Sequence, residues 1–138
     1  MSSVTASNDG SGTSLPSSAR TVLVVDDNVA AATMLALLLG RLGAGKVETT
    51  HDGPSAVVKA KELRPDLILL DIGLPGMDGY QVARTLRGES DLDGAVLVAL
   101  TGYGQEQDRQ RSREAGFDEH LVKPASIDDL KRVLAMTR

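Results

Sequence analysis

The sequence contains no cysteine, and this absence excludes several functions at once. Without thiols the chain can form neither a disulfide framework nor a thiolate active site, so thiol redox chemistry is excluded and a reducing cytosol fits. A secretory signal is also missing, because no basic stretch followed by an apolar run stands at the N-terminus. The longest apolar run, residues 29–39, is too short to cross a bilayer. We therefore expect a cytoplasmic protein that does not insert into membranes.

A surplus of positive charge is lacking as well. The 15 lysines and arginines are spread among 19 aspartates and glutamates, which gives a formal net charge of -4. No basic stripe is available to a phosphate backbone, and we do not expect direct binding of nucleic acid. With 138 residues the chain is long enough for one domain with its own core, and a second folded domain does not fit.

The first 19 residues differ in composition from the rest of the chain. They are rich in serine, threonine, glycine and asparagine and have few large apolar side chains, which predicts a disordered tail or linker over residues 1–19. From residue 20 onward, short β-branched or leucine-rich runs alternate with helical patterns. The folded domain is therefore expected to span residues 20–138.

This alternation predicts five β-strands and five helices. The strands are expected at residues 21–25, 46–50, 66–70, 95–100 and 118–122, and the helices at 29–42, 54–63, 79–86, 106–115 and 126–136. Three of the strands are almost wholly apolar, which is typical of strands covered on both faces in parallel sheets. Ser126 and Asp129 are spaced like an acidic variant of a helix capping box. Five βα units predict an α/β fold with a doubly wound parallel sheet.

Polar side chains stand where the predicted strands end. Asp26 and Asp27 follow the first strand, Asp71 the third, Thr101 the fourth and Lys123 the fifth. Because ligands of open parallel sheets bind beyond the carboxyl ends of the strands, we expect these side chains to meet at one edge. Three acids at one edge repel one another, which favours a cation, and oxygen ligands suit Mg²⁺.

Four motifs in this order resemble those of response-regulator receiver domains, and the resemblance covers the chain from about residue 20 to its end. They are VLVVDDN (22–28), LILLDIGLPGMDG (67–79), ALTGYG (99–104) and LVKPAS (121–126). The resemblance implies a (βα)5, flavodoxin-like receiver fold with strand order 2-1-3-4-5. It also implies a phosphorylation-activated signalling switch of a two-component system or phosphorelay, rather than an enzyme that acts on a separate substrate.

The resemblance assigns roles to the acids. Asp71 is the nucleophile that accepts a phosphoryl group from a phosphohistidine. Asp27 and Asp71 are direct ligands of Mg²⁺, Asp26 acts through a coordinated water, and the backbone carbonyl of Gly73 supplies another oxygen. Together these roles imply a metal-assisted transfer of a phosphoryl group to a carboxylate.

Lys123 and Thr101 are implied to contact two further phosphoryl oxygens, through a mobile charge and a hydroxyl. The Lys123–Pro124 bond resembles the family's Lys-Pro peptide, which is often cis, although cis X-Pro bonds make up only about 5% in folded proteins. Together with the acids, these residues complete the expected acceptor site.

Two parts of the sequence depart from the family's pattern. The switch pairs Thr101 with an aromatic residue three positions before Lys123, and this position holds His120. We expect His120 either to reorient toward the phosphorylated edge or to lie exposed on an edge strand. Gly73 and Tyr103 occupy the positions that tune dephosphorylation, and neither carries a group that positions water, so the phosphoryl group should last at least minutes.

The first predicted helix is apolar nearly all round, so part of its apolar surface should remain exposed. By resemblance, this helix docks the histidine-bearing bundle of a histidine kinase or phosphotransfer protein, with Met34 or Leu37 contributing. Coverage by the N-terminal tail or by a second copy fits the pattern equally well. We expect a monomer or a weak dimer.

Two other classes share part of this pattern. A flavodoxin-like FMN-binding module without phosphoacceptor activity has a similar sheet, but it needs a phosphate loop after the first strand and aromatics around the flavin. Here the acidic segment 26–28 follows that strand, and the aromatics are Tyr80, Tyr103 and Phe117. A phosphatase of the haloacid dehalogenase type needs a second acid two residues after its nucleophile, where Gly73 stands. The receiver reading is therefore favoured over both.

The place of the domain in a larger protein stays open. The chain ends directly after the last predicted helix, so we expect no output domain to follow. A free-standing regulator and the terminal receiver of a hybrid kinase both fit, and the GLPGMDGYQVA and LTGYG segments resemble receivers of hybrid sensor kinases.

Overall fold

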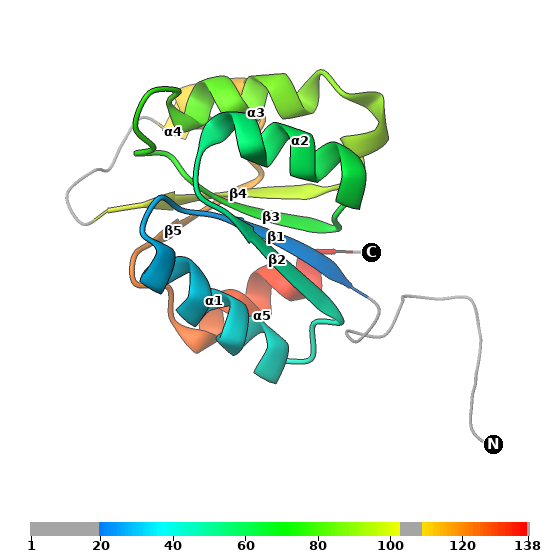
Figure 1. Cartoon of the computed structure of the whole chain (residues 1–138), viewed down its shortest axis with the longest axis vertical. Helices are drawn as coiled ribbons and strands as arrows, with labels where there is room; N and C mark the ends of the chain where they lie inside the picture. Colours follow the sequence, from blue (N-terminus) through cyan, green and yellow to red (C-terminus); the bar gives the residue numbers. More distant parts are fainter. Residues whose placement is uncertain (1–19, 103–108, 138) are drawn as a thin grey trace.

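The computed structural model describes residues 20–102 and 109–137, in which strands and helices alternate along the chain (Figure 1). The strands are β1 (Thr21–Val25), β2 (Lys46–Thr50), β3 (Leu67–Asp71), β4 (Val96–Thr101) and β5 (Glu119–Val122). The helices are α1 (Val29–Arg41), α2 (Gly53–Leu63), α3 (Gly79–Arg87), α4 (Arg109–Ala115), α5 (Ile127–Met136) and the short 3-10 helix η3 (Ser90–Leu92). Within these ranges no helix is both long and apolar enough to pass through a membrane. The predicted tail, residues 1–19, lies outside the described residues.

The strands form one parallel sheet in the order β2-β1-β3-β4-β5. Helices α1 and α5 cover one face of the sheet, and α2, α3 and α4 cover the other (Figure 1). β1 pairs with β2 on one side and with β3 on the other, so the strand order changes direction at β1. This is the switch point where ligands of such sheets bind. The predicted doubly wound α/β fold and its strand order are confirmed.

The central strands are apolar on both sides because helices cover both faces. In β1, Val22 and Val24 pack toward α1 and α5, while Leu23 and Val25 pack toward α2 and α3, and all four are fully buried. β3 continues the same alternation, and its residues 67–70 are at most 1% exposed. Side chains of successive strand residues point to opposite faces, so one apolar run supplies both cores.

Four helices begin at a residue whose side chain accepts a hydrogen bond from a main-chain N–H of the first turn. These residues are Asn28 for α1, Asp52 for α2, Asp78 for α3 and Ser126 for α5. Ser126 and Asp129 form the predicted reciprocal capping box, and Asp78 and Gln81 form a second one that was not predicted. The caps satisfy N–H groups that a helix leaves unpaired. They also fix where the chain turns after each strand.

Two predicted strands were placed one residue too early. Asp71 and Thr101 are the last residues of β3 and β4, instead of the first residues beyond them. The ladder reaches these polar residues because Asp71 pairs with Leu100 and Thr101 pairs with Val122. The functional residues at these positions are therefore held by the sheet itself. The start of the helix predicted at 106–115 lies outside the described residues.

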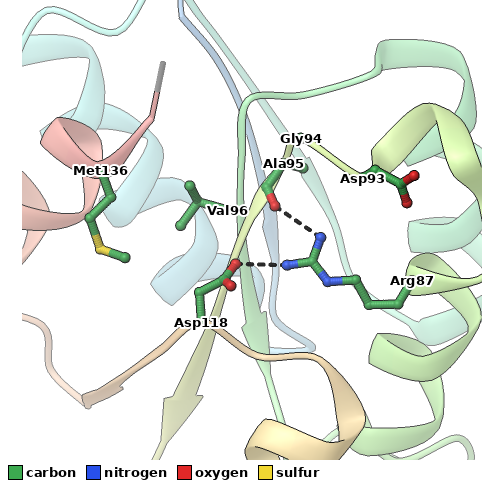
Figure 2. A pocket seen from close by; sticks show the side chains of 7 residues that line it. All are labelled: Arg87, Asp93, Gly94, Ala95, Val96, Asp118 and Met136. Atoms are coloured by element: carbon green, nitrogen blue, oxygen red, sulfur yellow. Dashed lines mark hydrogen bonds and ion pairs between the residues drawn. The ribbon is translucent and has the colours of Figure 1, made fainter.

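The amino ends of β4 and β5 are joined to α3 by Arg87 (Figure 2). Its Nε donates to the carbonyl of Gly116 at 2.9 Å, and its terminal nitrogens donate to the carbonyl of Ala95 at 3.0 Å and to Asp118 at 2.7 Å. Asp118 also accepts from the N–H of Leu97 at 2.8 Å. A shallow hollow of about 570 Å³ borders this group. These hydrogen bonds connect α3, the start of β4 and the segment before β5, at the edge of the sheet opposite to the acidic cluster.

Gly79, the first residue of α3, lies against the end of β3. A Cβ atom at this position would stand 2.4 Å from the Cα atom of Ile72 and 3.0 Å from the carbonyl oxygen of Asp71. The N–H of Gly79 donates to the carbonyl of Ile72 at 3.2 Å, which fixes the close approach. Glycine is required at position 79 because the neighbouring atoms belong to the main chain and cannot give way.

We predict that Gly79→Ala lowers the free energy of unfolding by about 2 kcal/mol or more, because the methyl group must displace the backbone next to Asp71. The control is Gly40→Ala in α1, where nothing lies within 4 Å of the added Cβ. That substitution should raise the free energy by about 0.5–1 kcal/mol, since alanine is the better helix former. Urea denaturation measures both, and equal effects of the two substitutions would contradict the close approach.

Candidate functional site

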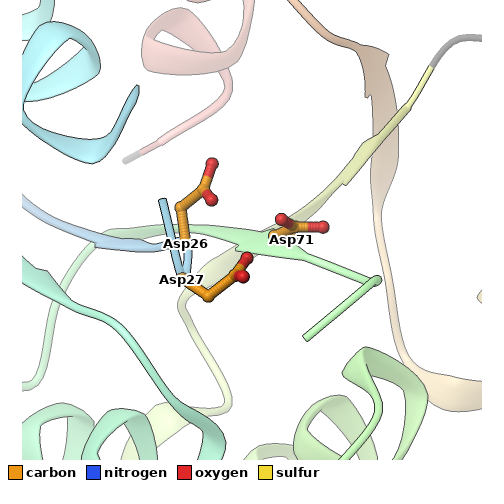
Figure 3. Close-up of side chains that lie close together, drawn as sticks. All are labelled: Asp26, Asp27 and Asp71. Carbon is orange, nitrogen blue, oxygen red and sulfur yellow. The ribbon is translucent and has the colours of Figure 1, made fainter. Parts of the chain in front are cut away.

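Three acids meet at the carboxyl ends of β1 and β3 (Figure 3). Asp26 and Asp27 directly follow β1, and Asp71 ends β3, which is hydrogen-bonded to β1. One carboxylate oxygen of each residue lies within 4.8 Å of those of the other two. Asp26 is 0% and Asp71 5% exposed, whereas Asp27 is exposed to solvent. The predicted meeting of these acids is confirmed.

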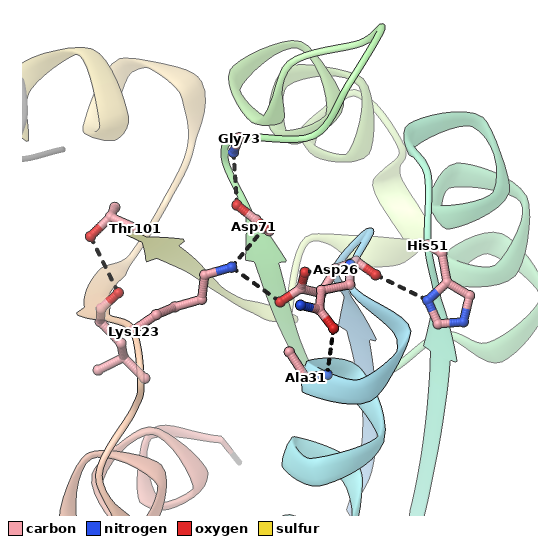
Figure 4. Close-up of polar contacts among 9 residues, drawn as sticks. Asp26, Ala31, His51, Asp71, Gly73, Thr101 and Lys123 are labelled. Carbon is pink, nitrogen blue, oxygen red and sulfur yellow. Dashed lines mark hydrogen bonds and ion pairs between the residues drawn. The ribbon is translucent and has the colours of Figure 1, made fainter. Parts of the chain in front are cut away.

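Lys123 reaches this acidic cluster from the loop after β5 (Figure 4). Its Nζ lies 2.9 Å from Oδ2 of Asp71 and 3.2 Å from Oδ2 of Asp26. Burial alone would lower the pKa of Lys123, but the hydrogen bond and charge of Asp71, with those of Asp26, outweigh it and raise the pKa. The Lys123–Pro124 peptide is cis, as the motif indicated. Lys123 is thus a fixed, protonated partner of both buried acids.

Main-chain N–H groups hold the other oxygens of the two buried acids. Asn28 donates to Oδ1 of Asp26 at 2.9 Å, and Gly73 donates to Oδ1 of Asp71 at 2.8 Å. Each carboxylate is therefore held at one oxygen by the backbone and at the other by Lys123. Because a carboxylate oxygen can accept more than one hydrogen bond or metal contact, both acids keep capacity for another partner.

Thr101 ends β4 beside the cluster, but its hydroxyl is turned away from the acids. The residue is 5% exposed, and Oγ1 donates to the carbonyl of Leu121 at 3.4 Å (Figure 4). This hydrogen bond is long compared with the usual 2.7–2.8 Å between a hydroxyl and an oxygen acceptor. The hydroxyl is therefore weakly held and can rotate to another acceptor at small cost.

His120 lies on β5 opposite Ala99 and is half-buried. Its ring faces Phe117 at 6.5 Å between centroids, and Phe117 meets Tyr80 edge to face at 6.1 Å. The guanidinium of Arg111, on α4, lies 4.1 Å from the centre of the Tyr80 ring. A row of rings thus connects His120 on β5 to α3 and α4. Tyr103, which was predicted together with Gly73 to tune dephosphorylation, lies outside the described residues.

The donor set suits a hard divalent cation. The three carboxylates of the acidic cluster face one ammonium group, so the cluster keeps a net negative charge. Its candidate ligand atoms are oxygens, which Mg²⁺ prefers, and Mg²⁺ commonly binds through one or two carboxylates while it keeps several waters. The residues present therefore fit magnesium.

One contact of this site had no signal in the sequence. The imidazole Nδ1 of His51, which follows β2, lies 3.0 Å from the backbone carbonyl oxygen of Asp26. A single histidine after a strand matches no motif, and its contact depends on how β2 is placed beside β1. The carboxylates and the lysine of the site could therefore be predicted from the sequence, whereas this imidazole could not.

Comparison with the sequences of known proteins supports the site that the geometry indicates. A sequence profile of the response regulator receiver domain matches residues 22–135. The chain belongs to this family. The cluster of Asp26, Asp27 and Asp71 matches the family's magnesium and phospho-aspartate site, and the domain is a phosphoacceptor switch of two-component signalling. The flavodoxin-like alternative is therefore not retained.

Similar receiver domains occur in longer regulators. The DNA-binding response regulator MtrA of Mycobacterium leprae is 40% identical over 118 residues, which are 85% of this chain and 51% of that protein. The phosphate regulon transcriptional regulatory protein PhoB of Escherichia coli K12 is 40% identical over 121 residues, 87% of this chain and 52% of that protein. The chain thus spans about half the length of each regulator.

Solved receiver structures are also similar. The receiver domain of the sensor histidine kinase PA1611 of Pseudomonas aeruginosa superposes with a TM-score of 0.76 and 33% identity, over 86% of this chain and 96% of that one. The chemotaxis response regulator CheY4 of Vibrio cholerae gives 0.76 and 30%, over 85% and 97%. The PA1611 domain has a magnesium ion coordinated in its active-site cleft.

We predict that Asp27→Asn raises the free energy of unfolding of the metal-free receiver domain by about 1 kcal/mol at low salt, because it removes one of three crowded negative charges. The same substitution should abolish most of the stabilisation by added Mg²⁺. The control is Asp52→Asn, which removes an exposed charge but keeps a residue that caps helices well. Calorimetry with and without Mg²⁺ measures both variants, and unchanged Mg²⁺ stabilisation of Asp27→Asn would contradict the cluster's role.

Proposed function

We propose that this receiver domain takes a phosphoryl group from a phosphohistidine onto Asp71 and changes its surface in response. The observation that carries the proposal is the contact of Lys123 with the two buried acids at 2.9 and 3.2 Å. The domain is proposed to span residues 20–138, with residues 1–19 as a tail or linker. Two-component signalling supplies the phosphoryl donor, since receiver domains accept it from histidine kinases.

The proposed transfer uses the carboxylate of Asp71 as nucleophile. An oxygen of Asp71 forms the new P–O bond, while the P–N bond of the phosphohistidine breaks and its electron pair returns to the imidazole of the donor. The N–H of Gly73 orients Asp71 through Oδ1. The ammonium of Lys123, already beside Oδ2, balances charge on a phosphoryl oxygen, and the Thr101 hydroxyl turns from Leu121 to another.

Asp26, Asp27, Asp71 and the carbonyl of Gly73 are proposed to hold Mg²⁺. Bound there, the ion would supply positive charge that offsets the charge of the phosphoryl oxygens. Asp27, Asp71 and the carbonyl would be direct ligands, and Asp26 would act through a coordinated water. The hydrogen bonds of Asp26 and Asp71 to main-chain N–H groups support this role, because they fix the two buried carboxylates before the ion binds. The exposed Asp27 leaves the cluster open to solvent on one side.

The phosphoryl group is proposed to persist for at least minutes. The positions that flank the reaction are Gly73 and Tyr103, and neither side chain offers an amide or acid to orient an attacking water. Gly73 has no side chain, and its N–H is engaged with Asp71. Slow hydrolysis of the aspartyl phosphate would allow the domain to pass the signal on before the phosphoryl group is lost.

His120 is proposed to couple the phosphorylated edge to helix α4. Support comes from the row of rings that joins His120, Phe117 and Tyr80 to Arg111. If Thr101 turns toward the phosphoryl group, it leaves the carbonyl of Leu121, the residue next to His120.

We expect His120→Ala to reduce the change that phosphorylation causes in the NMR signals of the α4 amides. His120→Tyr should retain that change. A change of wild-type size in His120→Ala would rule out the coupling role of His120.

The phosphodonor is proposed to dock on α1. The predicted exposure of apolar residues on α1 is confirmed for Met34 and Leu37, which are 57% and 59% exposed. A hollow of about 400 Å³ lies between α1 and the Lys123–Ala125 loop, with Asp26 and Lys123 at its polar side. A partner helix that places an apolar face in this hollow would bring its own histidine close to Asp71. The histidine-bearing helix of a kinase or phosphotransfer protein is such a partner.

We predict that incubation with phosphoramidate and Mg²⁺ adds one phosphoryl group to the protein, and that Asp71→Asn abolishes the gain. Intact mass spectrometry measures the addition, and omission of Mg²⁺ should slow it strongly. The control is Asp93→Asn, an exposed acid outside the cluster, which should leave the gain unchanged. Phosphorylation of Asp71→Asn at the wild-type rate would refute the assignment of the acceptor.

We predict that Met34→Lys and Leu37→Lys slow transfer from a phosphorylated histidine kinase by at least about tenfold, because they place charge in an apolar contact. Phosphorylation by phosphoramidate, which needs no docking surface, should keep its rate. The control is Val58→Lys on α2, which is 58% exposed but belongs to the opposite face of the sheet. Equal losses with both donors, or an equal loss in Val58→Lys, would contradict docking on α1.

A further inference from the structure

The backbone of Asp26 is bonded to the end of β2 through both of its polar groups. Its N–H donates to the carbonyl of Thr50 at 3.1 Å, and its carbonyl oxygen lies 3.0 Å from Nδ1 of His51 (Figure 4). The first bond is a main-chain contact that extends the ladder of β1 and β2. The second comes from a side chain, because β2 ends at Thr50 and the chain then turns into α2.

The chemistry of this contact fixes the proton on the imidazole. A backbone carbonyl can only accept a hydrogen bond, so Nδ1 of His51 must carry the proton and donate. The half-buried ring thus supplies a donor beyond the point where β2 stops. A side chain of another type at this position would need a hydrogen-bond donor at the same place to make the bond.

The carbonyl that His51 holds belongs to the peptide bond between Asp26 and Asp27. Peptide bonds are planar, so a hydrogen bond to this oxygen limits rotation of the whole unit and with it the direction in which Asp27 leaves the backbone. The Asp26 carboxylate has its own contacts with Asn28 and Lys123. Asp27, by contrast, is exposed, and its orientation depends more on the backbone that carries it.

We propose that His51 is a positioning residue for the acidic cluster. His51 donates a hydrogen bond from Nδ1 to the Asp26 carbonyl and so orients Asp27 for Mg²⁺. The proposal rests on the proposed function of the cluster as a magnesium site. His51 itself is not proposed to touch the metal or the phosphoryl group. Its effect is carried by the main chain, in the manner of hydrogen bonds that orient metal ligands from behind.

The test compares His51→Leu with His51→Asn in the full chain, using calorimetric titration with Mg²⁺ alone. His51→Leu should raise the dissociation constant about tenfold, the smaller end of what loss of such supporting bonds costs. In His51→Asn the amide nitrogen can occupy the place of Nδ1, so affinity should return to within about twofold of wild type. Phosphorylation by phosphoramidate should follow the same order at limiting Mg²⁺ and converge at saturating Mg²⁺.

Ala56→Gly in α2 is the control, because it weakens the neighbouring helix without removing a polar group. It should leave Mg²⁺ affinity unchanged, and a loss equal to that of His51→Leu would overturn the proposal. So would wild-type affinity in His51→Leu. Nitrogen NMR of the wild-type imidazole at alkaline pH adds a reading that needs no variant: a proton on Nδ1 supports the proposal, and a proton on Nε2 overturns it.

The outcomes separate this proposal from the proposed function. If the wild-type chain takes up no phosphoryl group with phosphoramidate and Mg²⁺, the proposed function fails, whatever His51 does. If it is phosphorylated but His51→Leu and His51→Asn bind Mg²⁺ equally well, the positioning role of His51 fails alone.

Discussion

The contact of Lys123 with Asp26 and Asp71 is the interaction on which the rest of the site depends. Two carboxylates that are 0% and 5% exposed stand at the ends of adjacent strands, where burial alone would disfavour their charge. One ammonium group within 3.2 Å of both compensates for that burial. Buried charges are tolerated when they are paired and hydrogen-bonded, and both conditions are met. The pairing also joins β1, β3 and the loop after β5 around a common point.

The sheet makes this contact possible by carrying polar residues to its edge without a break in the ladder. β3 and β4 run as buried apolar strands and end on Asp71 and Thr101, which are still in register with their neighbours. The backbone of both residues is therefore held by the hydrogen bonds of the sheet. The helices capped by Asn28 and Asp78 then lead the chain away from the sheet, so the acids stand at its switch point, with Asp26 and Asp71 buried and Asp27 exposed.

The sequence was sufficient for the fold and for the charged residues of the site, for two physical reasons. Strands buried on both faces leave continuous apolar runs, and strand ends place Asp26, Asp71 and Lys123 at one edge in any sheet of this topology. Strand ends were missed by one residue because apolar character stops before the hydrogen-bonded ladder does. Asp71 and Thr101 are polar, yet they remain paired within the sheet.

Contacts that depend on side-chain rotation or on neighbouring loops could not be predicted in this way. The hydroxyl of Thr101 donates to Leu121 and not toward the acids, a choice of rotamer that no motif encodes. His120 is half-buried and its ring lies beside that of Phe117, a residue just before β5, and no motif indicates this pairing. His51 reaches Asp26 because β2 lies beside β1 and stops at Thr50.

A crystal structure of the chain with Mg²⁺ and beryllofluoride, an analogue of the phosphoryl group, would show the acceptor site directly. We expect beryllofluoride on the carboxylate of Asp71, in contact with Lys123, and the Thr101 hydroxyl turned away from Leu121 toward it. We expect the ion among Asp26, Asp27 and Asp71. Beryllofluoride bound at any other residue, or an ion held away from these acids, would show that Asp71 is not the acceptor or that the acids do not bind the metal.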